Sequence, residues 1–330
     1  MTASLTVTAP TRLHFGLLSF GNTGRQFGGT GVMLETPRLQ LTICKADKFS
    51  ALGQGNLPQR VSEFAGRWAQ HHQRLLPNCE VEIVDCPAQH VGLGVGTQLG
   101  LAVAAGLSAW VDLPRQNAVE LGTSVGRGLR SAVGTYGFVG GGFIVERGKL
   151  KEPISPLDCQ IDVPPQWRFV LIRPQVKCSV WGAEEQSNFD QLPPVTEETT
   201  NRLVDILKHK VVPGVATDDF DLFSAGLYSY GQIAGNCFTS IQGGPYNGVQ
   251  ITKVVETVRQ LGIEGVGQSS WGPTVFAVTR NQDAAGELSE KLRELLREFP
   301  VEIHISSPAN HGAIITDARK PVSPATRKSQ

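Results

Sequence analysis

The stretch HVGLGVGTQLGLAVAAG, residues 90–106, joins a glycine-rich loop directly to an apolar helix. Glycines let the backbone approach a ligand and adopt positive φ, and the start of the helix presents unpaired N–H groups and a positive dipole end. The stretch therefore predicts a phosphate or pyrophosphate site. Its candidate phosphate-binding residues are Gly92, Gly94, Gly96, Thr97 and Gln98.

The stretch departs from the sequence patterns of two familiar phosphate-binding loops. A Walker loop ends in Lys-Ser/Thr, whereas Thr97 follows Gly96 with no lysine nearby. A dinucleotide loop follows its strand at once, but several residues separate the expected strand 81–84 from Gly92. Asp112 stands at a tolerable spacing for a ribose ligand, so this interpretation stays open. The alternative without a ligand is a turn whose glycines only let the helix pack closely.

The composition bounds the class of protein. At 330 residues the chain is long enough for two domains. Thirty basic residues balance thirty acidic ones, so no global field favours nucleic acid or an anionic membrane, and any anion site must be local. Six cysteines lack a C-x-x-C pair, and the N-terminus lacks the features of a signal peptide. We expect a cytoplasmic protein with no membrane span.

Hydrophobic patterns predict strands interleaved with helices, which is typical of an α+β fold. The expected strands are residues 5–8, 39–43, 81–84, 143–146, 168–172, 275–278 and 301–305. The expected helices are residues 59–76, 99–111, 117–125, 196–209, 218–234, 248–261 and 288–299. A proline-rich shift near residues 150–166 predicts domains at 1–160 and 161–318, and residues 319–330 form an expected disordered tail.

Three motifs resemble those of the GHMP small-molecule kinase superfamily. They are APTR at residues 9–12, the loop GLGVGTQ with its helix, and GVGQSSWGPT at residues 265–274. The resemblance implies a two-domain GHMP kinase-like fold. Its N-terminal domain would resemble the second domain of ribosomal protein S5, and its C-terminal domain would be a ferredoxin-like α/β plait. Val95 stands where kinase relatives often have serine, which makes ordinary ATP-dependent chemistry less expected.

A narrower resemblance is to the β-ribofuranosylaminobenzene 5′-phosphate synthase family. Its motifs are TRLHFGLLSFGNTGRQFGGTGVML, GLGVGTQLGLAVA, GRGLRSAVGTYGFVGGGF, WGAEEQSNF and QGGPYNG. The family condenses phosphoribosyl pyrophosphate with a 4-substituted benzoate (4-aminobenzoate or 4-hydroxybenzoate), releasing CO₂ and pyrophosphate in tetrahydromethanopterin biosynthesis. The resemblance implies Mg²⁺ and no redox cofactor, and it is compatible with a homodimer. Ser19 and Phe27 depart from acidic residues that archaeal members tend to carry.

The candidate site residues follow from these motifs. Arg25 and His14 are the catalytic candidates, because a guanidinium binds carboxylate or phosphate and an imidazole at i, i+2 from Arg12 shares its strand face. The further substrate-binding candidates are Arg12, Arg127, Arg130, Ser131, Gln268, Ser269 and Ser270, with Arg127 and Arg130 expected on one helix face. Thr97 and Glu184 are candidate Mg²⁺ ligands. Two alternatives remain: an ATP-dependent small-molecule kinase, and a non-catalytic protein that binds a phosphate ligand.

Overall fold

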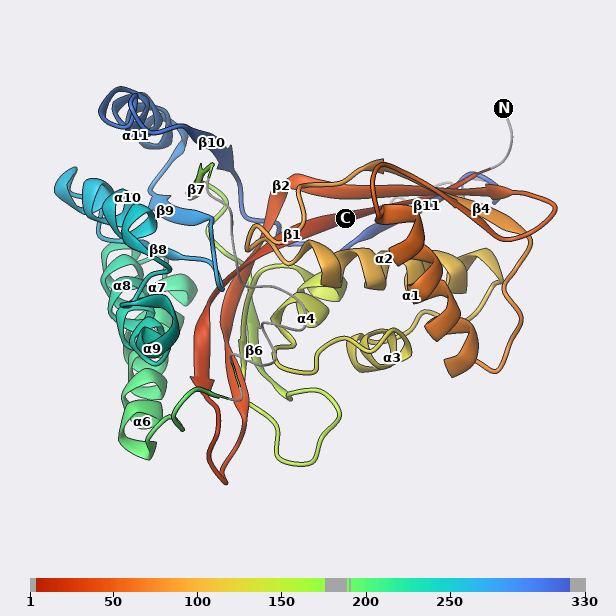
Figure 1. Ribbon diagram of the computed structural model, residues 1–330, viewed down its shortest axis with the longest axis horizontal. Helices are drawn as coiled ribbons and strands as arrows, with labels where there is room; N and C mark the ends of the chain where they lie inside the picture. The colour runs from red at the N-terminus through yellow and green to blue at the C-terminus, as the bar shows by residue number, and fades with distance from the viewer. Residues whose placement is uncertain (1–3, 176–188, 190, 321–330) are drawn as a thin grey trace, which may run out of the picture.

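The computed structural model describes residues 4–175, 189 and 191–320, and the described residues form two sheets (Figure 1). The first sheet has seven strands in the order β11-β1-β2-β4-β3, with β5 paired to β2 and β6 to β5. These strands are β1 (Leu5–Ser19), β2 (Phe27–Lys45), β3 (Ser50–Leu52), β4 (Cys79–Asp85), β5 (Phe143–Glu146), β6 (Leu157–Ile161) and β11 (Ile314–Asp317). All their pairings are antiparallel except that of β3 with β4, which α1 connects.

The long hairpin of β1 and β2 is the backbone of the molecule. The sequence predicted only the short strands 5–8 and 39–43, yet the glycine-rich stretch between them is itself paired, with Thr11–Ser19 opposite Phe27–Leu34. Its glycines allow this because Gly29 and Gly31 press against backbone carbonyls of β1, where a side chain has no room. The pairing is irregular between His14 and Gly16, and such a bulge changes the direction of the neighbouring side chains.

Four helices belong to the first sheet: α1 (Leu57–His71), α2 (Val95–Trp110), α3 (Ala118–Ser124) and α4 (Val133–Gly140). Helix α2 is apolar on nearly all sides because it lies between the sheet and α1. Gly100 lets it approach Phe64 of α1, and Gly106 lets it approach Ile43 of β2. The helix predicted after the glycine loop is therefore a central core element of this layer.

The second sheet has the order β10-β7-β9-β8, with every neighbouring pair antiparallel. Its strands are β7 (Arg168–Pro174), β8 (Val266–Gln268), β9 (Val275–Thr279) and β10 (Val301–Ser306). Helix α10 (Val249–Gln260) precedes the β8–β9 hairpin, and α11 (Gln282–Leu295) joins β9 to β10. This strand order and these crossovers are those of a ferredoxin-like α/β plait, so the predicted C-terminal fold is confirmed.

The two central strands of the second sheet, β7 and β9, are buried on both faces, and alternate residues of β7 point to different layers. Val170 and Ile172 pack in the core that α10 and α11 form. Phe169 and Leu171 instead join the main core with residues of α8 (Phe220–Asn236), which also contacts β1. The remaining helical segments are α6 (Glu197–Ile206), the π-helical turn η1 (Leu207–Val211), α7 (Val212–Ala216) and α9 (Thr239–Gln242).

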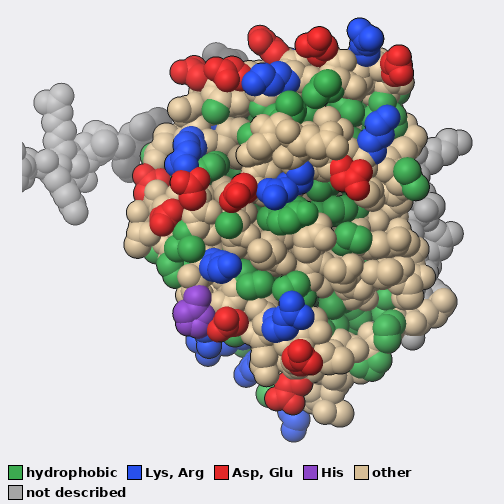
Figure 2. Space-filling model, turned by 90° about the vertical axis from the view of Figure 1, so that its left-hand side faces the viewer, with side chains coloured by type: hydrophobic (Ala, Val, Ile, Leu, Met, Phe, Trp, Pro, Cys, Tyr) green, Lys and Arg blue, Asp and Glu red, His purple; other side chains and the backbone are tan. Residues whose placement is uncertain are grey.

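The chain passes from the first sheet to the second between Ile161 and Arg168, and its last strand returns to the first sheet. β11 pairs with β1 and lies far in sequence from the other strands of that sheet. No helix among the described residues is long and apolar enough to cross a membrane. On the face that carries α8, α10 and α11, acidic and basic side chains are interspersed (Figure 2).

Candidate functional site

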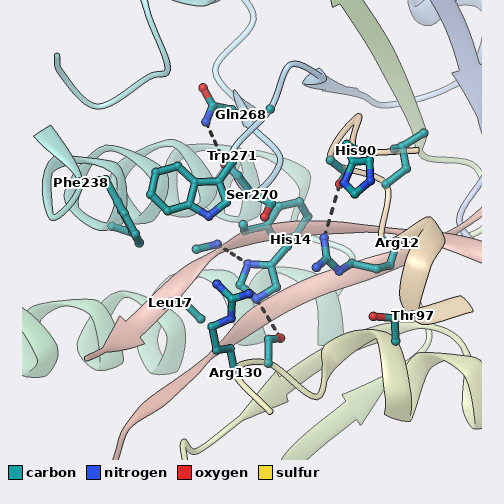
Figure 3. A pocket seen from close by; sticks show the side chains of 18 of the residues that line it. Arg12, His14, Leu17, His90, Thr97, Arg130, Phe238, Gln268, Ser270 and Trp271 are labelled. Atoms are coloured by element: carbon teal, nitrogen blue, oxygen red, sulfur yellow. Dashed lines mark hydrogen bonds between the residues drawn. The ribbon is translucent and has the colours of Figure 1, made fainter. Parts of the chain in front are cut away.

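A cavity of about 550 Å³ lies where the two sheets meet. Its walls come from β1, the start of α2, the segment 126–131, the end of α8 and the segment 267–272 (Figure 3). Segments far apart in sequence therefore converge on one space. Both glycine-rich motifs contribute to its walls, as the prediction of a phosphate site requires.

Hydrogen bonds clamp the two glycine-rich loops to each other and to β1. Ser269 Oγ donates to the carbonyl of Gly92 at 2.7 Å and accepts from the backbone N–H of His14 at 3.0 Å. Thr274 Oγ1 donates to the carbonyl of Val91. Gly92 has φ +87°, and a Cβ there would lie 2.6 Å from the Ser269 carbonyl oxygen. This glycine is therefore required for the contact between the loops.

One end of the cavity is cationic. Arg12, Arg60 and Arg127, all half-buried, line it beside the first turn of α2, and no side chain caps the helix. Gly94 has φ +67° and leaves room for Arg12, whose Cγ would lie 2.7 Å from a Cβ at that position. The positive end of the helix dipole and three guanidinium groups have the chemistry that suits a multiply charged anion.

The other end of the cavity is aromatic. Phe189, Phe238 and Trp271 line it and pack edge to face, with ring centroids 5.0–5.8 Å apart. The guanidinium of Arg130 lies 4.9 Å from the centre of the Phe189 ring. Figure 3 shows Trp271, Phe238 and Leu17 on one side of His14, and Arg12 and Thr97 on the other. The cavity thus has room for a flat apolar group at one end, next to a place for a polyanion at the other.

His14 stands between the two ends and has both ring nitrogens engaged. Nδ1 accepts from the backbone N–H of Gly16 at 3.2 Å, and Nε2 lies 2.9 Å from Ser131 Oγ. Ser131 in turn donates to the carboxylate of Glu146 at 2.6 Å. Burial lowers the pKa of His14 well below 6.5, and the charge of Arg12 lowers it further. His14 is therefore neutral at pH 7 and is not a free base in this arrangement.

Most of the predicted binding residues lie around this cavity. Those that line it are Arg12, His14, Gly92, Gly94, Gly96, Thr97, Arg127, Arg130, Ser131, Gln268 and Ser270. Arg12 and His14 share a face of β1, as their spacing predicted. The expected helix face of Arg127 and Arg130 is wrong: both lie in a loop between α3 and α4, where Gly126 and Gly128 have positive φ.

Three of the predicted residues that the structure describes are not among those that line the cavity. Ser269 is fully buried in the loop clamp described above. Gln98 is also fully buried, and its Nε2 donates to the Gly134 carbonyl at 2.9 Å, so it joins α2 to α4. Arg25 lies in the turn between β1 and β2, where it donates to the Gly148 carbonyl at 2.7 Å and pairs with Glu152 at 3.3 Å.

The described residues do not fit a protein-held Mg²⁺ ion. Mg²⁺ is usually bound through one or two carboxylates, whereas no Asp or Glu is among the described residues that line the cavity. The described chain also holds no cluster of three His, Cys, Asp or Glu side chains that suits a metal. Thr97 offers one hydroxyl in the first turn of α2, and Glu184 lies outside the described residues.

Sequence reasoning missed Arg60, the aromatic end and Glu146. Arg60 was detectable, because helical spacing puts it on one face with Phe64 and Arg67, and all three lie together. Glu146 was also detectable as an acid that closes the apolar run of β5; it is fully buried. The aromatic end had no local signal, since its three rings come from segments far apart in sequence.

Comparisons with known proteins agree with this architecture. Residues 215–298 match the family model described as GHMP kinases C terminal. The β-ribofuranosylphenol 5′-phosphate synthase of Methanothermobacter thermautotrophicus is 28% identical, covering 96% of this chain and 99% of the relative. The synthase of the same name from Archaeoglobus fulgidus is also 28% identical, covering 94% and 99%. The resemblance predicted from the sequence motifs is thereby confirmed.

Solved structures of the same fold include homoserine kinase from Cytophaga hutchinsonii, with a TM-score of 0.68 and 17% identity over 96% of this chain and 98% of that one. Mevalonate diphosphate decarboxylase from Staphylococcus aureus gives a TM-score of 0.66 and 13% identity over 96% and 99%. At these identities the likeness concerns the fold alone. The chain has the GHMP kinase fold, as predicted.

Proposed function

We propose that this protein is a synthase that joins phosphoribosyl pyrophosphate to a 4-substituted benzoate, releasing CO₂ and pyrophosphate. The names of its relatives supply the product class, a ribofuranosylphenol 5′-phosphate. The observation that carries the proposal is the divided cavity, with arginines at one end, aromatic rings at the other and no carboxylate among its described lining residues. The proposed place of the product in tetrahydromethanopterin biosynthesis rests on the family resemblance.

The reaction balances without a net proton transfer. The benzoate carbon that bears the carboxylate bonds to ribose C1, while the bond from C1 to the diphosphate oxygen breaks and pyrophosphate leaves with the electron pair. The bond from the ring to the carboxylate then breaks, its electrons restore the aromatic ring, and CO₂ leaves. No general base is needed, which agrees with an uncharged His14 whose two nitrogens are already hydrogen-bonded.

The cationic end suits the diphosphate. Charge-assisted hydrogen bonds from Arg12, Arg60 and Arg127 would meet the charge that grows on the leaving group, and so favour its departure. The first amides of α2 would add donors of fixed direction. We propose that Mg²⁺ enters with the diphosphate as part of the substrate, since the described lining residues do not supply a carboxylate for it.

The aromatic end suits the benzoate ring. Phe238 and Trp271 would hold the ring by edge and face contacts, and their apolar surroundings would keep water from the ribose cation that forms when pyrophosphate leaves. A low-polarity environment also favours loss of the carboxylate as neutral CO₂. Since both relatives are named for a phenol, we propose 4-hydroxybenzoate as the preferred acceptor over 4-aminobenzoate.

A kinase with this fold is the second candidate. Phosphorylation of an alcohol releases a proton, so a carboxylate or imidazole base usually helps it. Among the described lining residues, His14 has both nitrogens hydrogen-bonded and His90 lies at the exposed rim. A protein that only binds the phosphate ligand is the third candidate, and its cavity would need no aromatic end.

One set of incubations separates the three candidates. Purified protein is given phosphoribosyl pyrophosphate, Mg²⁺ and either 4-hydroxybenzoate or 4-aminobenzoate, and the products are identified by mass spectrometry. The proposal predicts a ribofuranosyl-aryl 5′-phosphate that lacks the carboxyl group. Turnover only with ATP and an alcohol would establish a kinase. Calorimetric binding of phosphoribosyl pyrophosphate without turnover of any acceptor would establish a binding protein.

A further inference from the structure

Glu146 is a buried carboxylate directly behind the wall of the cavity. It ends β5, is fully buried and does not line the cavity itself. One oxygen accepts from the Ser131 hydroxyl at 2.6 Å, and the other accepts from the backbone N–H of Ala132 at 2.8 Å. A buried charge is costly unless hydrogen bonds compensate it, so a fixed arrangement of donors surrounds this side chain.

The hydrogen bonds around Ser131 fix the position of every proton from Gly16 to Glu146. The Gly16 N–H points at His14 Nδ1, so Nδ1 carries no proton and the neutral ring must carry it on Nε2. Nε2–H then donates to Ser131 Oγ, which also accepts from the Val133 N–H at 3.3 Å. The single hydroxyl proton of Ser131 is therefore left for Glu146. Each donor in this series of hydrogen bonds therefore faces one acceptor.

We propose that Glu146 is a positioning residue: through Ser131 it fixes His14 as the Nε2–H tautomer, and through Ala132 it holds the segment that carries Arg130 at the cavity wall. Burial raises the pKa of Glu146, and hydrogen bonds from Ser131, Ala132 and Ser155 together with the charge of Arg12 offset only part of that rise. Those donors are the groups that an ionised carboxylate needs. The tautomer part of the proposal stands alone, and the part that concerns turnover rests on the proposed function.

Replacing Glu146 with glutamine reverses the donor and acceptor roles along the hydrogen bonds from Glu146 through Ser131 to His14. If the amide oxygen accepts from Ala132, the amide nitrogen must donate to Ser131 Oγ, and the serine proton must turn toward His14. His14 Nε2 would then have to accept, which moves the ring proton to Nδ1 and against the Gly16 N–H. An isosteric change that removes no volume thus leaves two donors facing each other, whichever way the amide is turned.

The first test is the ¹⁵N NMR spectrum of histidine-labelled protein at pH 7. The resonances of His14, one of seven histidines, are assigned by their loss in His14→Gln. The proposal predicts a neutral Nε2–H tautomer in the wild type, and ring shifts that change in Glu146→Gln. A wild-type ring that is an imidazolium or the Nδ1–H tautomer would overturn it, and so would unchanged shifts in the variant. The wild-type spectrum alone determines the tautomer, even if Glu146→Gln does not fold.

The second test is kinetic. Glu146→Gln and Ser131→Ala should each lower kcat about tenfold or more, because a buried hydrogen bond to a charged group is lost. Glu146→Asp keeps the carboxylate and should recover part of kcat, whereas the exposed Asp158→Asn on neighbouring β6 should behave as wild type. Equal activity of wild type and Glu146→Gln would refute the positioning role. A wild type without synthase activity but with the predicted tautomer would refute the proposed function instead.

Discussion

His14 shows how a single side chain couples the cavity to the core behind it. Its backbone holds the loop of residues 265–274 against β1, since its N–H donates to Ser269 Oγ and its carbonyl accepts from the Ser270 N–H at 3.0 Å. Its ring, in turn, leads through Ser131 to Glu146. The sequence placed His14 correctly beside Arg12, but it suggested a catalytic group where the hydrogen bonds indicate a neutral, fixed one.

The depressed pKa of His14 makes the stability of the fold depend on pH. The unfolded chain binds this proton below pH 6.5 and the folded protein does not, so the free energy of unfolding falls as the pH falls below 6.5. For each unit by which folding lowers the pKa of His14, the free energy of unfolding falls by about 1.4 kcal/mol as the pH drops across that unit. Glu146 has the opposite effect on the free energy of unfolding. Its pKa is raised in the folded protein, so protonation of this buried carboxylate at low pH favours the folded state.

The contribution of His14 to the pH dependence of stability can be measured by urea unfolding of wild type and His14→Gln at pH about 7.5 and about 5.5. We expect His14→Gln to be less stable at the higher pH but to lose less stability between the two. His72 and His304, whose pKa values burial also lowers, are present in both proteins and cancel. Equal losses in wild type and variant would show that His14 is not responsible.

A pair of substitutions tests whether the two ends of the cavity serve different substrates. Phe238→Leu removes an aromatic contact, so the KM for the benzoate should rise several-fold while the Kd for phosphoribosyl pyrophosphate stays unchanged. Arg60→Gln should weaken the binding of phosphoribosyl pyrophosphate about tenfold or more and leave benzoate binding unchanged. Each variant is the control for the other, and parallel losses of both ligands would contradict the division.

At the scale of elements, the sequence predicted the buried strands and amphipathic helices best. The expected strand 143–146 is β5, and the expected helix 248–261 contains α10. The β1–β2 hairpin was underestimated because its glycines indicate loops locally, whereas here they make room for close backbone pairing. The same ambiguity misplaced Arg127 and Arg130 on a helix, although Gly126 and Gly128 interrupt that segment.

The glycine loop and the start of α2 offer a matched pair of substitutions. Gly96 is helical and faces the end of the flexible Arg60 side chain, so Gly96→Ala should displace that guanidinium without destabilising the fold. Gly94 has φ +67° and packs on the stem of Arg12, so Gly94→Ala should cost about 1 kcal/mol or more.

We therefore expect Gly96→Ala to keep its melting temperature and bind phosphoribosyl pyrophosphate several-fold more weakly, while Gly94→Ala melts earlier. Calorimetry and thermal unfolding measure the two effects. If Gly96→Ala binds phosphoribosyl pyrophosphate as the wild type does, the loop serves helix packing rather than phosphate.

At the scale of the whole molecule, the site exists only where the two sheets meet. Sequence motifs predicted the glycine loop and every described arginine of the cavity lining except Arg60, because phosphate-binding glycines and arginines occur in recognisable local patterns. They did not predict the aromatic end, since Phe189, Phe238 and Trp271 are brought together by the second sheet and its helices. Arg25, one of the two catalytic candidates from the sequence, instead ties the β1–β2 turn to Gly148 and Glu152.

The release of CO₂ is the most direct measure of the central claim. Wild-type protein is incubated with phosphoribosyl pyrophosphate, Mg²⁺ and 4-hydroxybenzoate labelled in its carboxyl carbon, and labelled CO₂ and pyrophosphate are counted together. The divided cavity predicts one CO₂ for each pyrophosphate, with no need for ATP. Pyrophosphate released without CO₂, or labelled benzoate recovered intact while ATP is consumed, would contradict it.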